Sequence, residues 1–147
     1  MVAALLQEAG WYVVPSYDYA GDEKDKAPKL QGNKYSFVIP DLDISRAGNR
    51  LWAEVKTKRE PTEHRVTKRV EHGIPLRHFQ HYQRVQEITG CPVWLFVVEE
   101  SSGDVLCGKL DELTKNGREY NGNKMSNGGM IFFLRGDFKQ WGRVQPL

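Results

Sequence analysis

The stretch that decides the fold of this chain is YSFVIPDLDISRAGNRLWAEVKTK, residues 35–58. It contains two segments rich in aromatic and β-branched residues, 35–44 and 51–58, which predict β-strands. Gly48 and Asn49 lie in the connection between them, and both residue types tolerate the positive φ angles of tight turns. The stretch therefore predicts a β-hairpin.

The register of this hairpin decides which charged side chains meet. A turn centred between residues 47 and 48 places Asp41 directly across from Glu54, with their Cβ atoms about 5 Å apart. A loop made of residues 48 and 49 instead places Asp41 opposite Lys56 and Asp43 opposite Glu54, whereas a turn centred on residue 48 breaks the alignment. Both two-residue turns leave all four side chains on one face, because side chains alternate along a strand.

Carboxylates clustered in a half-buried strand pair repel one another, and a divalent cation removes that cost. Oxygen ligands suit Mg²⁺, with Mn²⁺ as a substitute, and the main-chain carbonyl of Val55 could join Asp41 and Glu54 as a ligand. Such an ion can activate water and stabilise charge on a phosphate, while Lys56 orients the water. The same residues would also suit a surface hairpin with a cross-strand Glu–Lys pair.

An acid-x-Lys triplet alone is weak evidence, because the chain has two others, at residues 22–24 and 137–139. The first lies in a charged segment, 20–34, that has no apolar period and predicts a solvated loop. The second has no hairpin that joins it to an upstream aspartate. The triplet at 54–56 has both a strand context and such a hairpin.

The rest of the chain predicts one α/β domain over residues 1–147. Residues 2–9 suit a helix that ends at Gly10, and residues 11–14 suit a strand. A second helix begins after Pro75 and ends at Gly90. Its apolar stripe consists of Leu76, Phe79, Tyr82, Val85 and Ile88. Strands are predicted at 92–98, 105–110 and 130–134, whereas residues 57–75 are polar and show no period. The order is αβββαβ around a central mixed sheet, with a β-rich C-terminal extension.

Pro40-Asp41 and Glu54-Val55-Lys56, between an N-terminal helix and a helix–strand pair, resemble the motif of the PD-(D/E)XK nuclease superfamily. The resemblance covers residues 2–98. It implies a restriction-endonuclease-like fold and Mg²⁺-dependent hydrolysis of phosphodiester bonds. It also implies that Asp41 and Glu54 bind the metal and that Lys56 is the catalytic lysine.

Two further positions follow from the same resemblance. Many members carry a glutamate in the first helix, and Glu8, close to the helix end, is the residue available here. Some members carry a Gln or Tyr on the helix after the motif, for which Gln80 and Tyr82 are the candidates. Tyr82 lies on the apolar stripe, which favours a place in the core.

Basic residues gather directly after the motif. Residues 56–77 contain seven Lys or Arg against three Glu, a larger surplus than the +2 of the whole chain. Such clustering suits contact with a phosphate backbone. The residues predicted to bind nucleic acid are Lys58, Arg65, Lys68, Arg69, Arg77 and Gln80.

The predicted function is a Mg²⁺-dependent endo- or exodeoxyribonuclease, with DNA favoured over RNA as the substrate. A homodimer would suit the cutting of paired strands. The alternative is a non-catalytic nucleic-acid-binding module on the same fold. A protein-interaction domain whose basic loop meets an acidic partner is a third interpretation.

Composition argues against several other classes. The longest strongly apolar run, 93–98, is too short to span a membrane, and the apolar N-terminus lacks the basic leader of a secretion signal. These features predict a cytoplasmic protein and fit a microbial or viral source. Cys91 and Cys107 form no CxxC pair and predict reduced thiols. His78 and His81 have the helical spacing of a metal pair, but no third soft ligand completes a zinc site.

Overall fold

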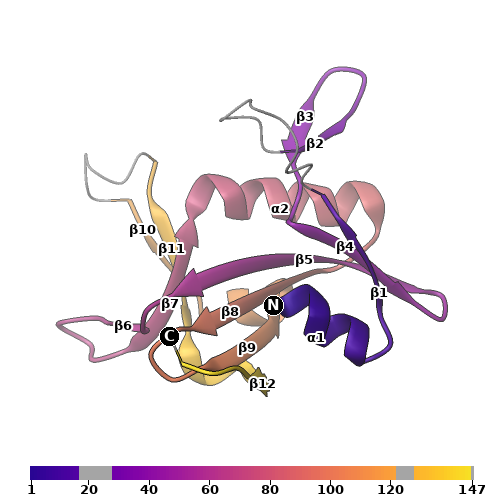
Figure 1. Ribbon diagram of the computed structural model, residues 1–147. Coiled ribbons are helices and arrows are strands. Elements are labelled where there is room, and N and C mark those ends of the chain that lie inside the picture. Colours follow the sequence, from indigo (N-terminus) through magenta and orange to yellow (C-terminus); the bar gives the residue numbers. More distant parts are fainter. Residues whose placement is uncertain (17–27, 122–127, 147) are drawn as a thin grey trace, which may run out of the picture.

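The computed structural model describes residues 1–16, 28–121 and 128–146, and a six-stranded mixed sheet lies at its centre (Figure 1). Its strands lie in the order β1 (Tyr12–Pro15), β4 (Leu42–Arg46), β5 (Asn49–Lys58), β8 (Val93–Glu99), β9 (Asp104–Lys109) and β12 (Lys139–Arg143). β5 and β8 run parallel, and the other neighbouring pairs run antiparallel. The predicted mixed sheet is confirmed.

The parallel pair needs a long crossover connection, because parallel strands cannot be joined by a tight turn. This crossover contains β6 (Thr62–Glu63), β7 (Val70–Pro75) and α2 (Leu76–Thr89). β6 and β7 belong to a second sheet with the order β10 (Arg118–Tyr120), β11 (Met130–Leu134), β7, β6. The other elements are α1 (Val2–Glu8), the β2–β3 ribbon (Lys29–Gln31 and Ser36–Val38), α3 (Leu110–Thr114) and the 3₁₀ turn η1 (Arg135–Asp137).

Two clusters of buried apolar side chains lie on opposite faces of the six-stranded sheet. α1 packs its buried Val2 and Leu6 on the face that carries Ile44 and Ala53. α2 packs Phe79, Tyr82 and Val85 on the other face, against Trp52, Leu95 and the inner residues of β11. Figure 1 shows α2 above β5 and α1 below it. The elements α1, β1, β4, β5, α2 and β8 give the predicted αβββαβ order, and β9 to β12 form the β-rich extension.

The hairpin has the first of the predicted registers. Leu42 pairs with Ala53 and Ile44 with Leu51, so the turn is centred between Ala47 and Gly48, which both have positive φ (47° and 82°). The predicted strand 35–44 is two strands, because β3 ends at Val38 and β4 begins at Leu42. Pro40 lies in the gap, where its missing N–H cannot join a ladder.

Several boundaries differ from the prediction. Residues 57–75, expected to lack regular structure, contain the end of β5 and the strands β6 and β7. Residues 20–27 of the predicted loop lie outside the described part of the chain, and 29–31 form β2. The apolar stripe of α2 ends at Val85, because Ile88 is 51% exposed. Gly90 ends this helix with φ +66°, as predicted. Among the described residues, no helix is long and apolar enough to cross a membrane.

Candidate active site

The first acidic residue of the site lies immediately before β4. The main chain of Asp41 is fixed by β1, because the Ser16 N–H donates to its carbonyl at 2.7 Å. Its side-chain Oδ2 accepts a hydrogen bond from the Val55 N–H at 2.9 Å. The hairpin register, continued by one step, places Asp41 opposite Glu54. Asp41 is therefore held against β5 at the point where β4 begins.

The second acidic residue, Glu54, is buried inside the sheet–helix interface and only 2% exposed. Its Oε1 lies 2.5 Å from Lys56 Nζ, and its carboxyl group also receives a hydrogen bond from Tyr82 on α2. Burial raises the pKa of Glu54, and the charge of Asp41 raises it further, while Lys56 and Tyr82 act in the opposite direction. The surrounding residues thus compensate this negative charge incompletely.

A divalent cation could supply the positive charge that Glu54 lacks. Asp41 and Glu54 offer carboxylate oxygens, and the Val55 carbonyl points to the same edge of β5 as the Val55 N–H that reaches Asp41. These hard donors suit Mg²⁺ or Mn²⁺. Asp41 and Val55 also line a hollow of about 310 Å³ beside the first residues of α1. Within residues 1–16, 28–121 and 128–146, no three His, Cys, Asp or Glu side chains form a metal cluster, so the remaining ligands would be the main chain and water.

His78 on α2 is a further residue of the site. Burial lowers the pKa of His78, and the positive charges of Lys56 and Arg77 lower it further. Its Nδ1 is buried and has no hydrogen-bond partner among the described residues. Its ring centroid lies 6.1 Å from that of Tyr82, one helical turn away. From the sequence, His78 was weighed as half of a zinc pair with His81 and not as a neighbour of Glu54 and Lys56. Its i, i+4 spacing to Tyr82 could have indicated this position.

A solved structure shares this architecture. The chain is similar to the Holliday junction resolvase Hjc from the archaeal hyperthermophile Archaeoglobus fulgidus, with a TM-score of 0.56 and 11% identity over 93% of this chain and 85% of Hjc. The chain shares the mixed α/β fold of this resolvase, which confirms the predicted restriction-endonuclease-like fold. It also resembles D212, a nuclease from a fusselovirus, with a TM-score of 0.49 and 10% identity over 95% of this chain and 77% of D212. No family model and no curated protein matches the sequence.

Within this fold, the two residues whose role the sequence left open lie outside the cluster. Asp43 shares the face of Glu54, but it is opposite Trp52 and its carboxylate pairs with Arg50 at 2.6 Å. Glu8 is exposed at the far end of α1, about 9 Å along the helix from Val2, which borders the hollow beside Asp41. Tyr82 is 2% exposed and belongs to the core, as predicted, and it also contacts Glu54.

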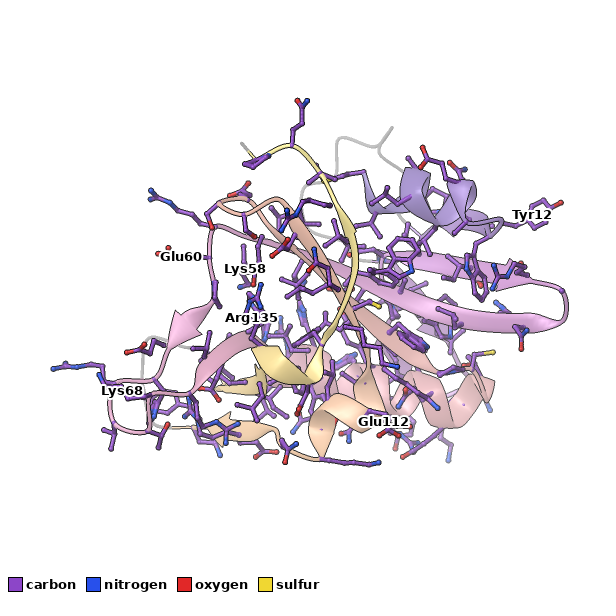
Figure 2. The ribbon with its side chains drawn as sticks, turned by 90° about the horizontal axis from the view of Figure 1, so that it is seen from below. Tyr12, Lys58, Glu60, Lys68, Glu112 and Arg135 are labelled. Atoms are coloured by element: carbon purple, nitrogen blue, oxygen red, sulfur yellow. The ribbon has the colours of Figure 1, made fainter. Side chains whose placement is uncertain are left out.

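The residues predicted to bind nucleic acid are divided among three parts of the fold. Lys58 is half-buried at the end of β5, two residues beyond Lys56. Arg77 and Gln80 are exposed on α2, and the charge of Arg77 reaches His78. Arg65, Lys68 and Arg69 lie between β6 and β7, and Figure 2 shows Lys68 on this outer hairpin, well separated from Lys58.

Two of these basic side chains already pair with carboxylates. Lys68 lies 3.4 Å from Glu63, and Arg69 lies 3.0 Å from the buried Glu71. Arg69 also donates to the Asn116 carbonyl at 2.7 Å. Arg65, Arg77 and Gln80 are therefore better placed than Arg69 to contact a phosphate backbone directly.

The remaining histidines have structural partners. His72 belongs to the segment 57–75 that was expected to lack regular structure, but it is buried in β7, and its Nε2 lies 2.7 Å from Glu99. His81 Nδ1 accepts from the Val38 N–H at 2.8 Å. Cys107 is buried, Cys91 is half-buried, and both are free thiols.

Proposed function

We propose that this protein is a metal-dependent nuclease that hydrolyses phosphodiester bonds in DNA. One observation carries the proposal: the buried Glu54, with its raised pKa, lies between Asp41 and Lys56 at the edge of the hairpin. The likeness to Hjc supports the fold on which such a site is built. A buried carboxylate whose charge is incompletely compensated is typical of functional sites.

Asp41, Glu54 and the Val55 carbonyl would hold Mg²⁺, which polarises the phosphate and lowers the pKa of bound water. Hydrolysis adds a water oxygen to phosphorus and breaks one P–O ester bond, so one product carries a phosphate monoester and the other a hydroxyl. Lys56 compensates part of the charge of Glu54. With a cation bound to Glu54, the Lys56 ammonium group would be free to donate to the attacking water or to a phosphate oxygen.

The decisive experiment compares two acid-x-Lys triplets of the same chain. Lys56→Met should abolish cleavage of labelled linear, nicked and branched DNA with Mn²⁺, whereas Lys139→Met, in the triplet 137–139, should leave it unchanged. Wild-type cleavage should also disappear with chelator. Unchanged cleavage by the Lys56→Met variant would reject the proposed role of the site.

The second candidate, a nucleic-acid-binding module that does not cleave, is favoured by the short Lys56–Glu54 ion pair. This pair compensates part of the charge of the buried carboxylate without any metal. Calorimetric titration with Mn²⁺ separates the two functions, because a nuclease site should bind the ion through Asp41. DNA binding together with a flat metal titration would favour the non-catalytic module.

A further inference from the structure

The outer face of the second sheet contains a hollow of about 290 Å³, away from the core. Thr62 to Arg65 border it on one side, and Arg118 and Tyr120 of β10 on the other. Phe132 and Glu71 also line it. The volume approaches that of small-molecule sites, so one nucleotide is a suitable occupant.

The floor of this hollow is a stacked arrangement across three strands. Phe132 pairs with Gly73 on one side and with Arg118 on the other. A Cβ on Gly73 would lie 2.7 Å from the Phe132 ring, so the ring rests directly on the glycine backbone. The Arg118 guanidinium lies 4.8 Å from the centroid of the same ring. The sheet therefore presents a planar cation supported by an aromatic ring.

A buried carboxylate keeps this cation in place. Glu71 is 1% exposed and binds Arg118 Nη2 at 2.8 Å and Arg69 Nε at 3.0 Å. Two guanidinium groups share one carboxylate, so this group of three carries one positive charge. The rim of the hollow also carries Glu63, whose carboxylate pairs with Lys68 at 3.4 Å. Arg65 is exposed at its rim, and Tyr120 is 40% exposed beside it. The hollow thus combines fixed positive charge with accessible planar groups.

We propose that this hollow binds one unpaired nucleotide of a single-stranded nucleic-acid segment. The base stacks on the Arg118 guanidinium and against Tyr120, and a neighbouring phosphate contacts Arg65. Unpaired bases can leave their stack and lie on aromatic or guanidinium planes, whereas bases inside a duplex cannot. The inference rests on the proposed nuclease function and narrows its substrate to DNA with a single-stranded part.

The chain connects the hollow to the candidate active site. Its rim at residues 62–65 follows β5, which carries Glu54 and Lys56, after three residues. β7, which supplies Glu71, continues directly into α2, which supplies His78. A nucleic-acid strand bound in the hollow would thus be held by the same two segments of the chain that carry the candidate catalytic residues.

Binding is tested by fluorescence anisotropy with the full chain in chelator, using a labelled 12-nucleotide single strand and the corresponding duplex. Arg118→Lys keeps a positive charge for Glu71 but removes the planar group. It should weaken single-strand binding by about fivefold or more and change duplex binding less than about twofold. Tyr120→Leu, at a position that is 40% exposed, should act in the same direction.

Arg50→Lys is the matched control. Arg50 is also held by a carboxylate, Asp43 at 2.6 Å, and its guanidinium lies 5.4 Å from the Trp52 ring, but it is not part of the hollow. It should leave single-strand binding unchanged. No single-strand binding by the wild type, no loss in Arg118→Lys and Tyr120→Leu, or equal losses for single strand and duplex would each overturn the inference.

Cleavage with Mn²⁺ is measured separately, so the two proposals can fail independently. Single-strand binding that depends on Arg118 but is accompanied by no cleavage would retain the hollow and reject the nuclease. Cleavage together with unaltered single-strand binding by Arg118→Lys would retain the nuclease and reject the role of the hollow.

Discussion

Replacing Lys56 by methionine separates the electrostatics of the site from its chemistry. Methionine keeps most of the apolar length of the side chain and removes the ammonium group that lies 2.5 Å from Glu54 Oε1. Glu54 would then remain 2% exposed, close to the charge of Asp41, with Tyr82 as its remaining neighbour that lowers the pKa. The variant should therefore be less stable than the wild type in chelator at pH 8.

The size of this loss follows from the burial of the pair. Breaking a fully buried ion pair costs about 3–5 kcal/mol. Here the Lys56 side chain is 27% exposed and Tyr82 still donates to Glu54, so we expect about 2–3 kcal/mol. For a chain of this length, the melting temperature should fall by roughly 6–10 °C.

The difference in stability between Lys56→Met and the wild type should depend on pH. The pKa of Glu54 is already raised by burial and rises further without Lys56, so the folded variant takes up a proton more readily than the unfolded chain. The stability difference from the wild type should therefore narrow as the pH falls from 8 towards 5. At pH 8, Mn²⁺ at ten times its dissociation constant should restore about 1.4 kcal/mol.

Urea denaturation of both proteins, with and without the ion, measures all three effects. Lys115→Met is the control, because Lys115 pairs with Glu112 at 2.7 Å on the open surface and its loss should leave unfolding unchanged. A Lys56→Met variant as stable as the wild type in chelator would refute the reasoning. So would a stability difference that does not change with pH.

Three other outcomes are expected. Asp41→Asn keeps an oxygen acceptor for the Val55 N–H but loses its charge, so calorimetry should show at least about tenfold weaker Mn²⁺ binding, and unchanged binding would contradict the ligand assignment. Arg135 holds the pKa of Glu99 at about 2, so Glu99 takes up a proton in the unfolded chain at a higher pH than in the folded protein. The free energy of unfolding should therefore fall by about 3 kcal/mol between pH 5 and 2. In urea titrations, Arg135→Met should reduce this fall. Gly90→Ala, at φ +66°, should cost about 1 kcal/mol in the same assay, and an equally stable variant would contradict it.

The hairpin shows how far the sequence alone could lead. The alternation of Leu42 and Ile44 with Asp41 and Asp43 assigned the two faces of the strand, because burial follows a period of two. The choice between two turn positions stayed open, since both keep that period. The structure selects the turn through the positive φ angles of Ala47 and Gly48. A non-glycine residue in this region is uncommon, so the sequence did not favour it.

β7 shows why another part of the fold was missed. Its buried residues include Glu71 and His72, so the strand has no apolar alternation to detect. Their partners come from distant segments: Arg118 lies 47 residues from Glu71, and Glu99 lies 27 residues from His72. A pattern search along the chain cannot find a strand whose buried charges are compensated only after folding.

Three buried glutamates finally distinguish structural carboxylates from the candidate catalytic one. Glu71 and Glu99 bind arginines, whose planar guanidinium groups remain charged, and Arg135 with His72 lowers the pKa of Glu99 to about 2. Glu54 binds a lysine instead, and its pKa is raised. All three are at most 2% exposed, so burial alone does not explain the difference. An arginine pair fixes a carboxylate permanently, whereas a flexible lysine can leave Glu54 to a cation and then act on the phosphate, which is the property a hydrolytic site needs.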